Sequence, residues 1–228
     1  MILFERTLTF GHVVGVAVDA AAQLPLVGAE ESIAAAFEGR RRATFTAGRA
    51  ALRHALAAID AAEASGIAAS PRGAPRLGDA AVGSISHKDE VAVALAACRA
   101  GRERIGVDVE LVAPLRVDIS RRVLCDEEHA FWTTLPEADR ARVLRIFFSL
   151  KEAIYKAIDP FVERYVGFRE VALGGLDALT QSGGSLEVHA RLSPAAPVSL
   201  YVEAAFELVD VGEARWIVSE ARATPRDL

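Results

Sequence analysis

Alternating apolar and polar positions predict strands in three stretches of the chain. The first stretch, residues 8–20, is rich in valine and alternates loosely, as an opening strand does. Two further groups of short apolar runs are separated by turns that carry Gly, Ser, Pro or charged residues. We expect strands over residues 81–86, 91–97 and 104–112, and over 168–173, 185–190, 199–208 and 214–221.

Apolar residues spaced three or four apart predict helices ahead of both of these later groups of strands. One helix should end near Gly39, and a longer one should follow it to Ile59; two more are expected over 126–135 and 137–158. Helices precede strands twice, so the pattern predicts an α+β fold of two similar lobes related by a pseudo-twofold axis. We place these lobes at residues 1–111 and 112–228.

Composition and charge narrow the class of protein. The chain is 52% hydrophobic, which is ample for a buried core, and no apolar run reaches the roughly 18 residues of a membrane span. The first residues do not resemble a signal peptide, and Cys98 and Cys125 read as buried free thiols of a cytoplasmic protein. The net charge of −5 argues against a general nucleic-acid binder, whereas the Arg-rich run over 40–53 suits a small polyanionic ligand.

A pair of carboxylates stands on one predicted strand, in "GVDVE". Because side chains alternate along a strand, Asp108 and Glu110 share one face and Val107 and Val109 the other. The pair could be the solvent-facing side of an edge strand. It could also bind Mg²⁺, since adjacent carboxylates repel unless a cation intervenes and oxygen ligands suit this ion.

The helix segment "FSLKEAIYKA" holds two of the chain's three lysines, while the other 23 basic residues are arginines. Glu152 and Lys156 lie one helical turn apart, which is also the spacing of an ordinary exposed ion pair. A compact ammonium meets phosphate as a point charge, unlike the planar fork of Arg. Glu152 is therefore a candidate third carboxylate for the metal, and Lys156 a candidate phosphate contact.

A third cluster, "GSISHK", places Ser84, Ser86 and His87 at the end of a predicted strand. Hydroxyl, imidazole and backbone amide groups there could converge on an anion. The chain has no GxSxG motif and no GK[ST] loop, which argues against a hydrolytic triad and a P-loop.

Four segments in this order resemble the 4'-phosphopantetheinyl transferases of the surfactin/enterobactin-synthetase type. They are the Arg-rich "RRRATFTAGRAALRHAL" with its following loop "PRGAPRLG", then "GSISH", "GVDVE" and "FSLKEAIYKA". The resemblance covers roughly residues 40–157; the segments are weak signals singly and specific together. The loop departs from the family in lacking the tryptophan of its "P-x-W-P-x-G" version, which leaves contacts to adenine open.

The resemblance implies a monomer of two similar lobes, each a small antiparallel sheet packed on helices, with coenzyme A in the cleft between them. The enzyme would transfer 4'-phosphopantetheine to a serine of an apo acyl or peptidyl carrier protein and release 3',5'-ADP. The implied Mg²⁺ ligands are Asp108, Glu110 and Glu152. The implied phosphate contacts are Lys156, Ser86, His87 and Lys151, with Arg49 and Arg76 near the 3'-phosphate or adenine of coenzyme A.

Glu152 is also our choice of proton acceptor for the serine hydroxyl. Acidic carrier proteins would need a local basic or apolar patch on this acidic chain, and Arg121, Arg122 and Phe131 are candidates for it. Two alternatives stay open: a non-catalytic module that binds coenzyme A or a nucleotide, and a Mg²⁺-dependent nucleotide pyrophosphatase.

Overall fold

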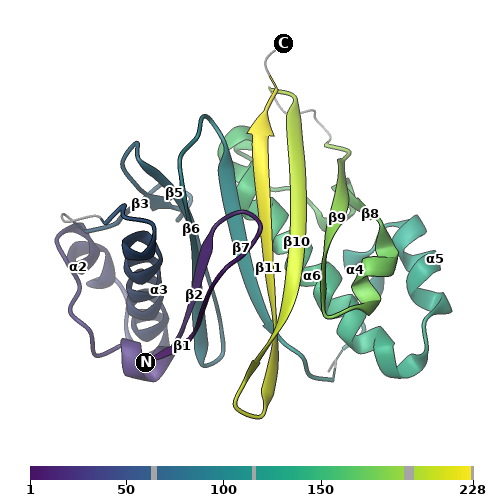
Figure 1. Cartoon of the computed structure of the whole chain (residues 1–228), viewed down its shortest axis with the longest axis horizontal. Coiled ribbons are helices and arrows are strands. Elements are labelled where there is room, and N and C mark those ends of the chain that lie inside the picture. Colours follow the sequence, from purple (N-terminus) through teal and green to yellow (C-terminus); the bar gives the residue numbers. More distant parts are fainter. Residues whose placement is uncertain (63–65, 115–116, 193–197, 227–228) are drawn as a thin grey trace.

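Two antiparallel sheets organise the molecule (Figure 1). The computed structural model describes residues 1–62, 66–114, 117–192 and 198–226. The first sheet has strand order β1-β2-β6-β5, and the second has strand order β7-β11-β10-β9-β8. The fold is therefore mixed α+β with small antiparallel sheets packed on helices, as the sequence predicted.

The first sheet is built from strands in the amino-terminal part of the chain. Its strands are β1 (Ile2–Thr7), β2 (His12–Ala17), β5 (Ala81–Lys88) and β6 (Val91–Cys98). The other elements of this part are α1 (Val18–Ala21), α2 (Ala29–Ala34), α3 (Gly39–Ala58) and the short pair β3 (Ala68–Ala69) and β4 (Pro75–Arg76). The strand predicted over 8–20 is wrong in extent, because a hairpin turn between Thr7 and His12 pairs β2 with an unpredicted strand β1.

Small residues let α3 lie close against the first sheet. Ala47, Ala51 and Ala55 are fully buried on the packing face of the helix. A Cβ atom at Gly48 would come within 2.7 Å of Cγ2 of Ile85 on β5, so a larger residue would push the helix away. This packing fixes the Arg-rich helix beside the strand that carries Ser86 and His87.

The second sheet and its helices come from the rest of the chain. The strands are β7 (Arg104–Leu111), β8 (Val171–Gly174), β9 (Gly183–Ala190), β10 (Leu200–Val211) and β11 (Ala214–Pro225). The helices are α4 (Ser120–Val123), α5 (Asp126–Thr134) and α6 (Glu137–Val162), with 3-10 turns η1 (Phe168–Glu170) and η2 (Leu176–Thr180). These elements confirm the predicted strands and helices, with shifts of a few residues at their ends.

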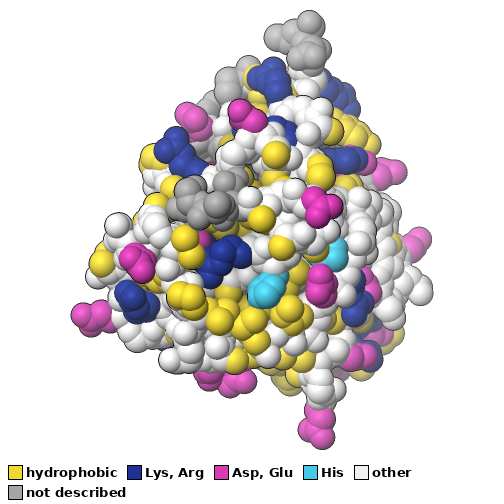
Figure 2. Space-filling view, turned by 60° about the vertical axis from the view of Figure 1, so that its left-hand side comes forward, with side chains coloured by type: hydrophobic (Ala, Val, Ile, Leu, Met, Phe, Trp, Pro, Cys, Tyr) yellow, Lys and Arg dark blue, Asp and Glu magenta, His cyan; other side chains and the backbone are white. Residues whose placement is uncertain are grey.

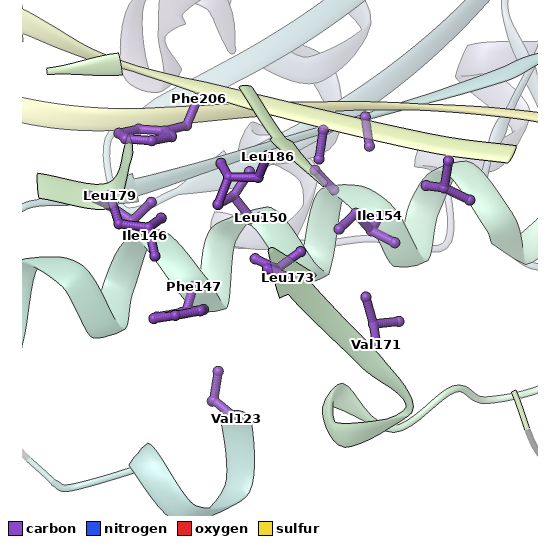
Figure 3. Close-up of a cluster of buried hydrophobic side chains, with 14 of the residues drawn as sticks. Val123, Ile146, Phe147, Leu150, Ile154, Val171, Leu173, Leu179, Leu186 and Phe206 are labelled. Atoms are coloured by element: carbon purple, nitrogen blue, oxygen red, sulfur yellow. The ribbon is translucent and has the colours of Figure 1, made fainter. Parts of the chain in front are cut away.

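Helix α6 lies against one face of the second sheet and forms the largest core cluster (Figure 3). Phe147, Leu150 and Ile154 are fully buried there against Leu173 and Phe206. A side chain of this size stabilises a fold by about 1.5–3 kcal/mol when it leaves water. At Gly106 a Cβ atom would lie 1.9 Å from the carbonyl oxygen of Ala153, so glycine is what allows α6 to approach β7 so closely.

The opposite face of the second sheet packs against the first sheet. Val107 and Val109 of β7 meet Trp216 of β11, together with Val93 and Leu95 of β6, in a third apolar cluster. The layers therefore run from α3 through the first and second sheets to α6 (Figure 1). The predicted alternation of β7 is confirmed, since its valines face the first sheet.

The division of the chain at residues 111 and 112 stays a prediction, and β7 ends directly before it. Strand β7 pairs with β11, with Asp108 opposite Ser219, and so belongs to the second sheet rather than the first. The chain therefore passes between the sheets before Arg104. Part of the predicted division, residues 115–116, lies outside the described residues.

Two further expectations can be compared with the structure. Both cysteines are free, as predicted, but Cys98 is exposed whereas Cys125 is buried. Among the described residues, none of the helices combines the length and apolar character of a membrane span.

Candidate active site

The two carboxylates of β7 are buried and point toward α6. Asp108 and Glu110 are each 6% exposed. Their neighbours on α6 are Lys156, whose Nζ lies 2.8 Å from Asp108 Oδ1, and Arg145, whose Nη1 lies 3.4 Å from Glu110 Oε2. The alternative that Asp108 and Glu110 lie on a solvent-exposed face of the strand is therefore wrong, because both carboxylates are buried and have cationic neighbours.

Lys156 also differs from an exposed helix ion pair. Its ammonium donates to Ser86 Oγ at 2.9 Å and to the carbonyl oxygen of Val107 at 2.9 Å, besides Asp108. These acceptors belong to β5 and β7, so Lys156 connects α6 to both sheets. The structure therefore brings Lys156 and Ser86 together with Asp108.

Glu152 shares the electrostatic surroundings of the β7 carboxylates. Burial raises its pKa, Asp108 and Glu110 raise it further by repulsion, and Lys156 opposes them. The pKa of Glu110 is likewise raised, mainly by burial and also by Asp108, while Lys88 and Arg145 lower it. Glu152 lies on the same side of α6 as Arg145 and Lys156, which contact Glu110 and Asp108, so it stands on the side of the β7 carboxylates.

The donor chemistry of this cluster fits a hard divalent cation. Carboxylate oxygens are the ligands that Mg²⁺ prefers. Within the described ranges, however, no three acidic, His or Cys side chains are already arranged to hold a metal ion. Cationic side chains lie against the carboxylates instead: Lys88 Nζ lies 3.1 Å from Glu110 Oε1. Asp108, Glu110 and Glu152 as Mg²⁺ ligands therefore stay a prediction.

The end of β5 adds a hydroxyl and an imidazole. Ser86 Oγ donates to Asp108 Oδ1 at 2.8 Å. Burial lowers the pKa of His87, and the positive charges of Lys156, Arg41 and Arg40 lower it further. His87 therefore lies near the cations of the cluster, where a ring N–H could donate to a phosphate.

The Arg-rich run does not form one open basic face. Arg40 pairs with Asp19, Arg53 with Glu30, and Arg42 donates to the carbonyl oxygen of Ala34. With the α2 and α3 side turned forward, basic and acidic side chains are interspersed over the surface (Figure 2). A ligand would therefore meet single arginines rather than a continuous patch.

The two arginines predicted near the 3'-phosphate or adenine have different environments. Arg49 is only 4% exposed, donates from Nε to the carbonyl oxygen of Ile67 at 3.2 Å, and lies over the ring of Phe45. Burial lowers the pKa of Arg49. Arg76 is exposed on β4. Contact of either residue with a ligand stays a prediction.

Lys151 does not lie with the cluster, and the structure argues against it as a phosphate contact. Its side chain is 1% exposed and its Nζ lies 2.6 Å from Glu128 Oε2. It also donates to the carbonyl oxygens of Val123 at 2.8 Å and Phe168 at 3.1 Å. An ammonium that is sealed from solvent and surrounded by three acceptors has no donor left for a ligand.

Sequence reasoning missed two cations of the cluster, Lys88 and Arg145. A signal existed for both. Lys88 is the third lysine of the chain and follows His87 directly, and Arg145 precedes Glu152 by seven residues, which is two helical turns on the same face.

A small pocket opens beside Glu152. Its volume is about 60 Å³, and its walls include Tyr155, Tyr165 and Phe168. Glu152 therefore lies at the boundary between the charged cluster and an aromatic recess, where a slender group could enter.

Models of known protein families match both halves of the chain. Residues 29–97 match the 4'-phosphopantetheinyl transferase N-terminal domain, and residues 104–205 match the 4'-phosphopantetheinyl transferase superfamily. The break between the matches agrees with the passage between the sheets before Arg104. Both motifs of the cluster, on β7 and α6, lie inside the second match.

A curated relative, 4'-phosphopantetheinyl transferase Npt of Nocardia iowensis, is 33% identical over 142 residues, which cover 62% of this chain. The chain spans 63% of the length of that relative. The two family matches together cover most of the chain and include the acidic cluster, the Ser-His strand end and the Lys156 helix. The chain belongs to the 4'-phosphopantetheinyl transferase superfamily.

Proposed function

We propose that this chain transfers the 4'-phosphopantetheine group of coenzyme A to a serine of an apo acyl or peptidyl carrier protein and releases 3',5'-ADP, as a holo-carrier-protein synthase. The observation that supports this most strongly is the buried pair Asp108 and Glu110 with Lys156 of α6 against it, in a chain of this superfamily. Phosphoryl transfer depends mainly on positioning and on neutralising charge, and this cluster offers both.

The proposed site lies in a cleft between two lobes, one for each sheet. Ser86 of the first sheet reaches Asp108 of the second, and Lys156 joins them, which supports a site shared by both lobes. All of these residues come from one chain, so we propose that the enzyme acts as a monomer.

In the proposed reaction, the serine oxygen of the carrier attacks the phosphorus that bears pantetheine. A P–O bond forms to serine, the diphosphate P–O bond breaks, and 3',5'-ADP leaves with the electron pair. Glu152, the carboxylate that lines the aromatic recess, accepts the hydroxyl proton. Lys156 and His87 stabilise negative charge on the phosphates through hydrogen bonds.

Mg²⁺, held by Asp108, Glu110 and Glu152, would neutralise charge on the diphosphate. Lys88 and Arg145 would then exchange part of their contact with Glu110 for contact with phosphate. Arg49 and Arg76 are proposed to lie on the side of the 3'-phosphate or adenine. The aromatic recess beside Glu152 is proposed to receive the pantetheine arm.

The carrier protein is proposed to dock near α4 and α5. Arg121 and Arg122 are exposed on α4, and Phe131 on α5 is partly exposed beside the core cluster of the second sheet. Exposed cations and a partly exposed aromatic side chain on two consecutive helices suit an acidic helix with an apolar edge.

Mass spectrometry of an apo carrier protein, incubated with the chain, coenzyme A and Mg²⁺, tests this function. The expected result is one phosphopantetheine group on serine, and a carrier with that serine changed to alanine should gain nothing. Hydrolysis of coenzyme A without a modified carrier would instead establish a pyrophosphatase. Binding of coenzyme A without either reaction would establish a binding module.

A further inference from the structure

Three buried side-chain oxygen atoms lack a hydrogen-bond partner among the residues that the structure describes: Asp108 Oδ2, Ser149 Oγ and Ser219 Oγ. Both serines are 0% exposed. An oxygen that is removed from water without a new partner destabilises a fold. Buried polar groups are normally paired, so three unpaired atoms in one molecule require a physical reason.

Ser219 lies directly opposite Asp108. Strands β7 and β11 are antiparallel, and their register pairs these two residues. Residues that face each other in this way point to the same side of a sheet, with Cβ atoms about 4.5–5.5 Å apart. Ile217 and Ala221, which share the face of Ser219, pack in the α6 cluster. Ser219 therefore stands beside Asp108 on the side of α6.

Ser149 approaches Asp108 from the helix. Arg145, Ser149, Glu152 and Lys156 follow one another at spacings of four, three and four residues, which form a single stripe along α6. Arg145 contacts Glu110 and Lys156 contacts Asp108, so this stripe faces β7. Ser149 lies within it, between the two contacts.

The two oxygens of Asp108 have different surroundings. Oδ1 accepts from Ser86 and from Lys156, whose side chain is 26% exposed, so it faces the open side of the cluster. Oδ2 is buried and unpaired. A carboxylate oxygen accepts up to two hydrogen bonds, and each serine hydroxyl can donate one after rotation about its Cα–Cβ bond.

We propose that Ser149 and Ser219 are positioning residues, whose hydroxyls donate to Asp108 Oδ2 and hold the carboxylate with Oδ1 directed at the metal and phosphate side. This inference rests on the proposed function, because it assigns the role of Asp108 to that reaction. It explains why all three unpaired atoms belong to the same place in the fold. Partners that orient a ligand in this way typically affect metal affinity by about 10–100-fold.

The test uses the full chain with Ser219→Ala and Ser149→Ala, and Thr46→Val as the control. Thr46 has a buried hydroxyl on α3 that donates to the carbonyl oxygen of Arg42, away from the cluster.

The binding of Mn²⁺ alone is measured by titration with electron paramagnetic resonance. We expect about tenfold weaker Mn²⁺ binding in each serine variant. The melting temperature should fall only slightly, because each variant removes one hydroxyl and leaves the other serine to donate to Asp108 Oδ2. Thr46→Val should bind Mn²⁺ like the wild type.

Ser219→Thr keeps the hydroxyl and should restore Mn²⁺ binding. Unchanged Mn²⁺ affinity in both alanine variants would overturn the inference, even with normal transfer to the carrier. Absence of Mn²⁺ binding by the wild type would overturn it as well. Weakened Mn²⁺ binding in the serine variants of a chain that transfers nothing would support the inference while the proposed function fails.

Discussion

Two lysines of α6, five residues apart, show how differently a lysine–carboxylate pair can be built. Lys151 and Glu128 are each 1% exposed, and their contact is 2.6 Å. Lys151 has three acceptors, and Glu128 accepts in addition from the backbone N–H groups of Cys125 and Leu173, both at 2.8 Å. Every donor of this ammonium is used, so the pair is sealed and saturated.

Lys156 and Asp108 form the open counterpart. The lysine side chain is 26% exposed, Asp108 Oδ2 has no hydrogen-bond partner, and the nearby carboxylates Glu110 and Glu152 have raised pKa values. A saturated buried pair fixes the position of a helix, whereas a pair with a partly exposed ammonium and an unpaired carboxylate oxygen can still bind a ligand. The comparison predicts that changes at Lys151 act on stability and changes at Lys156 act on activity.

The largest expected effect is that of Asp108→Ala on transfer. The variant removes a metal ligand and the acceptor of Ser86 and Lys156, so we expect the transfer rate to fall about 10³-fold. The melting temperature and circular dichroism should show a folded protein. Near-normal transfer at saturating Mg²⁺ would show that Asp108 does not hold the metal.

Substitutions in the buried pair Lys151–Glu128 should alter the stability of the fold. Lys151→Met leaves Glu128 charged and buried, which we expect to lower the free energy of unfolding by about 3–5 kcal/mol. Adding Glu128→Leu removes that charge and should recover part of the loss. Urea unfolding of the single and double variants measures both effects; an unchanged midpoint for Lys151→Met would contradict the structural role.

Lys156→Ala should reduce the transfer rate by about 10–100-fold, because the variant lacks the positive charge that neutralises the phosphates. The free energy of unfolding should change much less. Extra Mg²⁺ should not restore the rate. Steady-state kinetics over a range of Mg²⁺ concentrations is the measurement. Kinetics equal to those of the wild type would leave Lys156 with a structural role only.

The smallest expected effect is the pH dependence that Glu152 confers. As pH rises, transfer should increase, whereas the stability of the metal-free protein should decrease. Glu152 must be ionised to act, so transfer should decline at low pH, where protons compete with Mg²⁺ for its carboxylate. In metal-free protein the folded state holds this proton more tightly than the unfolded state. Stability should therefore fall as pH rises from 4.5, the ordinary value, through the raised pKa.

Glu152→Gln removes this contribution, so its stability should vary less with pH than that of the wild type. Urea unfolding at several pH values, without divalent cations, compares the two proteins. Identical pH profiles would show that Glu152 is not perturbed by its neighbours.

Local sequence patterns predicted most strands and helices, and also which side chains of the site share a face of a strand or helix. The alternation along β7 placed Asp108 and Glu110 together, and helical spacing placed Glu152 near Lys156, because both depend on nearby residues. The membership of β7 in the second sheet could not be predicted in this way, since β7 pairs with β11, about a hundred residues later, and no local signal carries that register. Unpaired atoms such as Ser219 Oγ are likewise set by long-range pairing.

The burial of Lys151 had a signal that was not used. Lys151 lies on the stripe of Phe147, Ile154 and Ile158, at spacings of four and three, which is the apolar face of α6. Arg49 similarly aligns with Leu52 and Leu56 on α3. Charged residues on an apolar stripe are expected to be buried and paired, and in Lys151 this pairing leaves no donor for a ligand.

The most direct test of the open cluster is a crystal structure of the chain with coenzyme A and Mn²⁺, collected at a wavelength where manganese scatters anomalously. We predict one anomalous peak in contact with carboxylate oxygens of Asp108, Glu110 and Glu152, with Lys156 at the diphosphate. A peak bound elsewhere, or coenzyme A bound away from these carboxylates, would contradict the account.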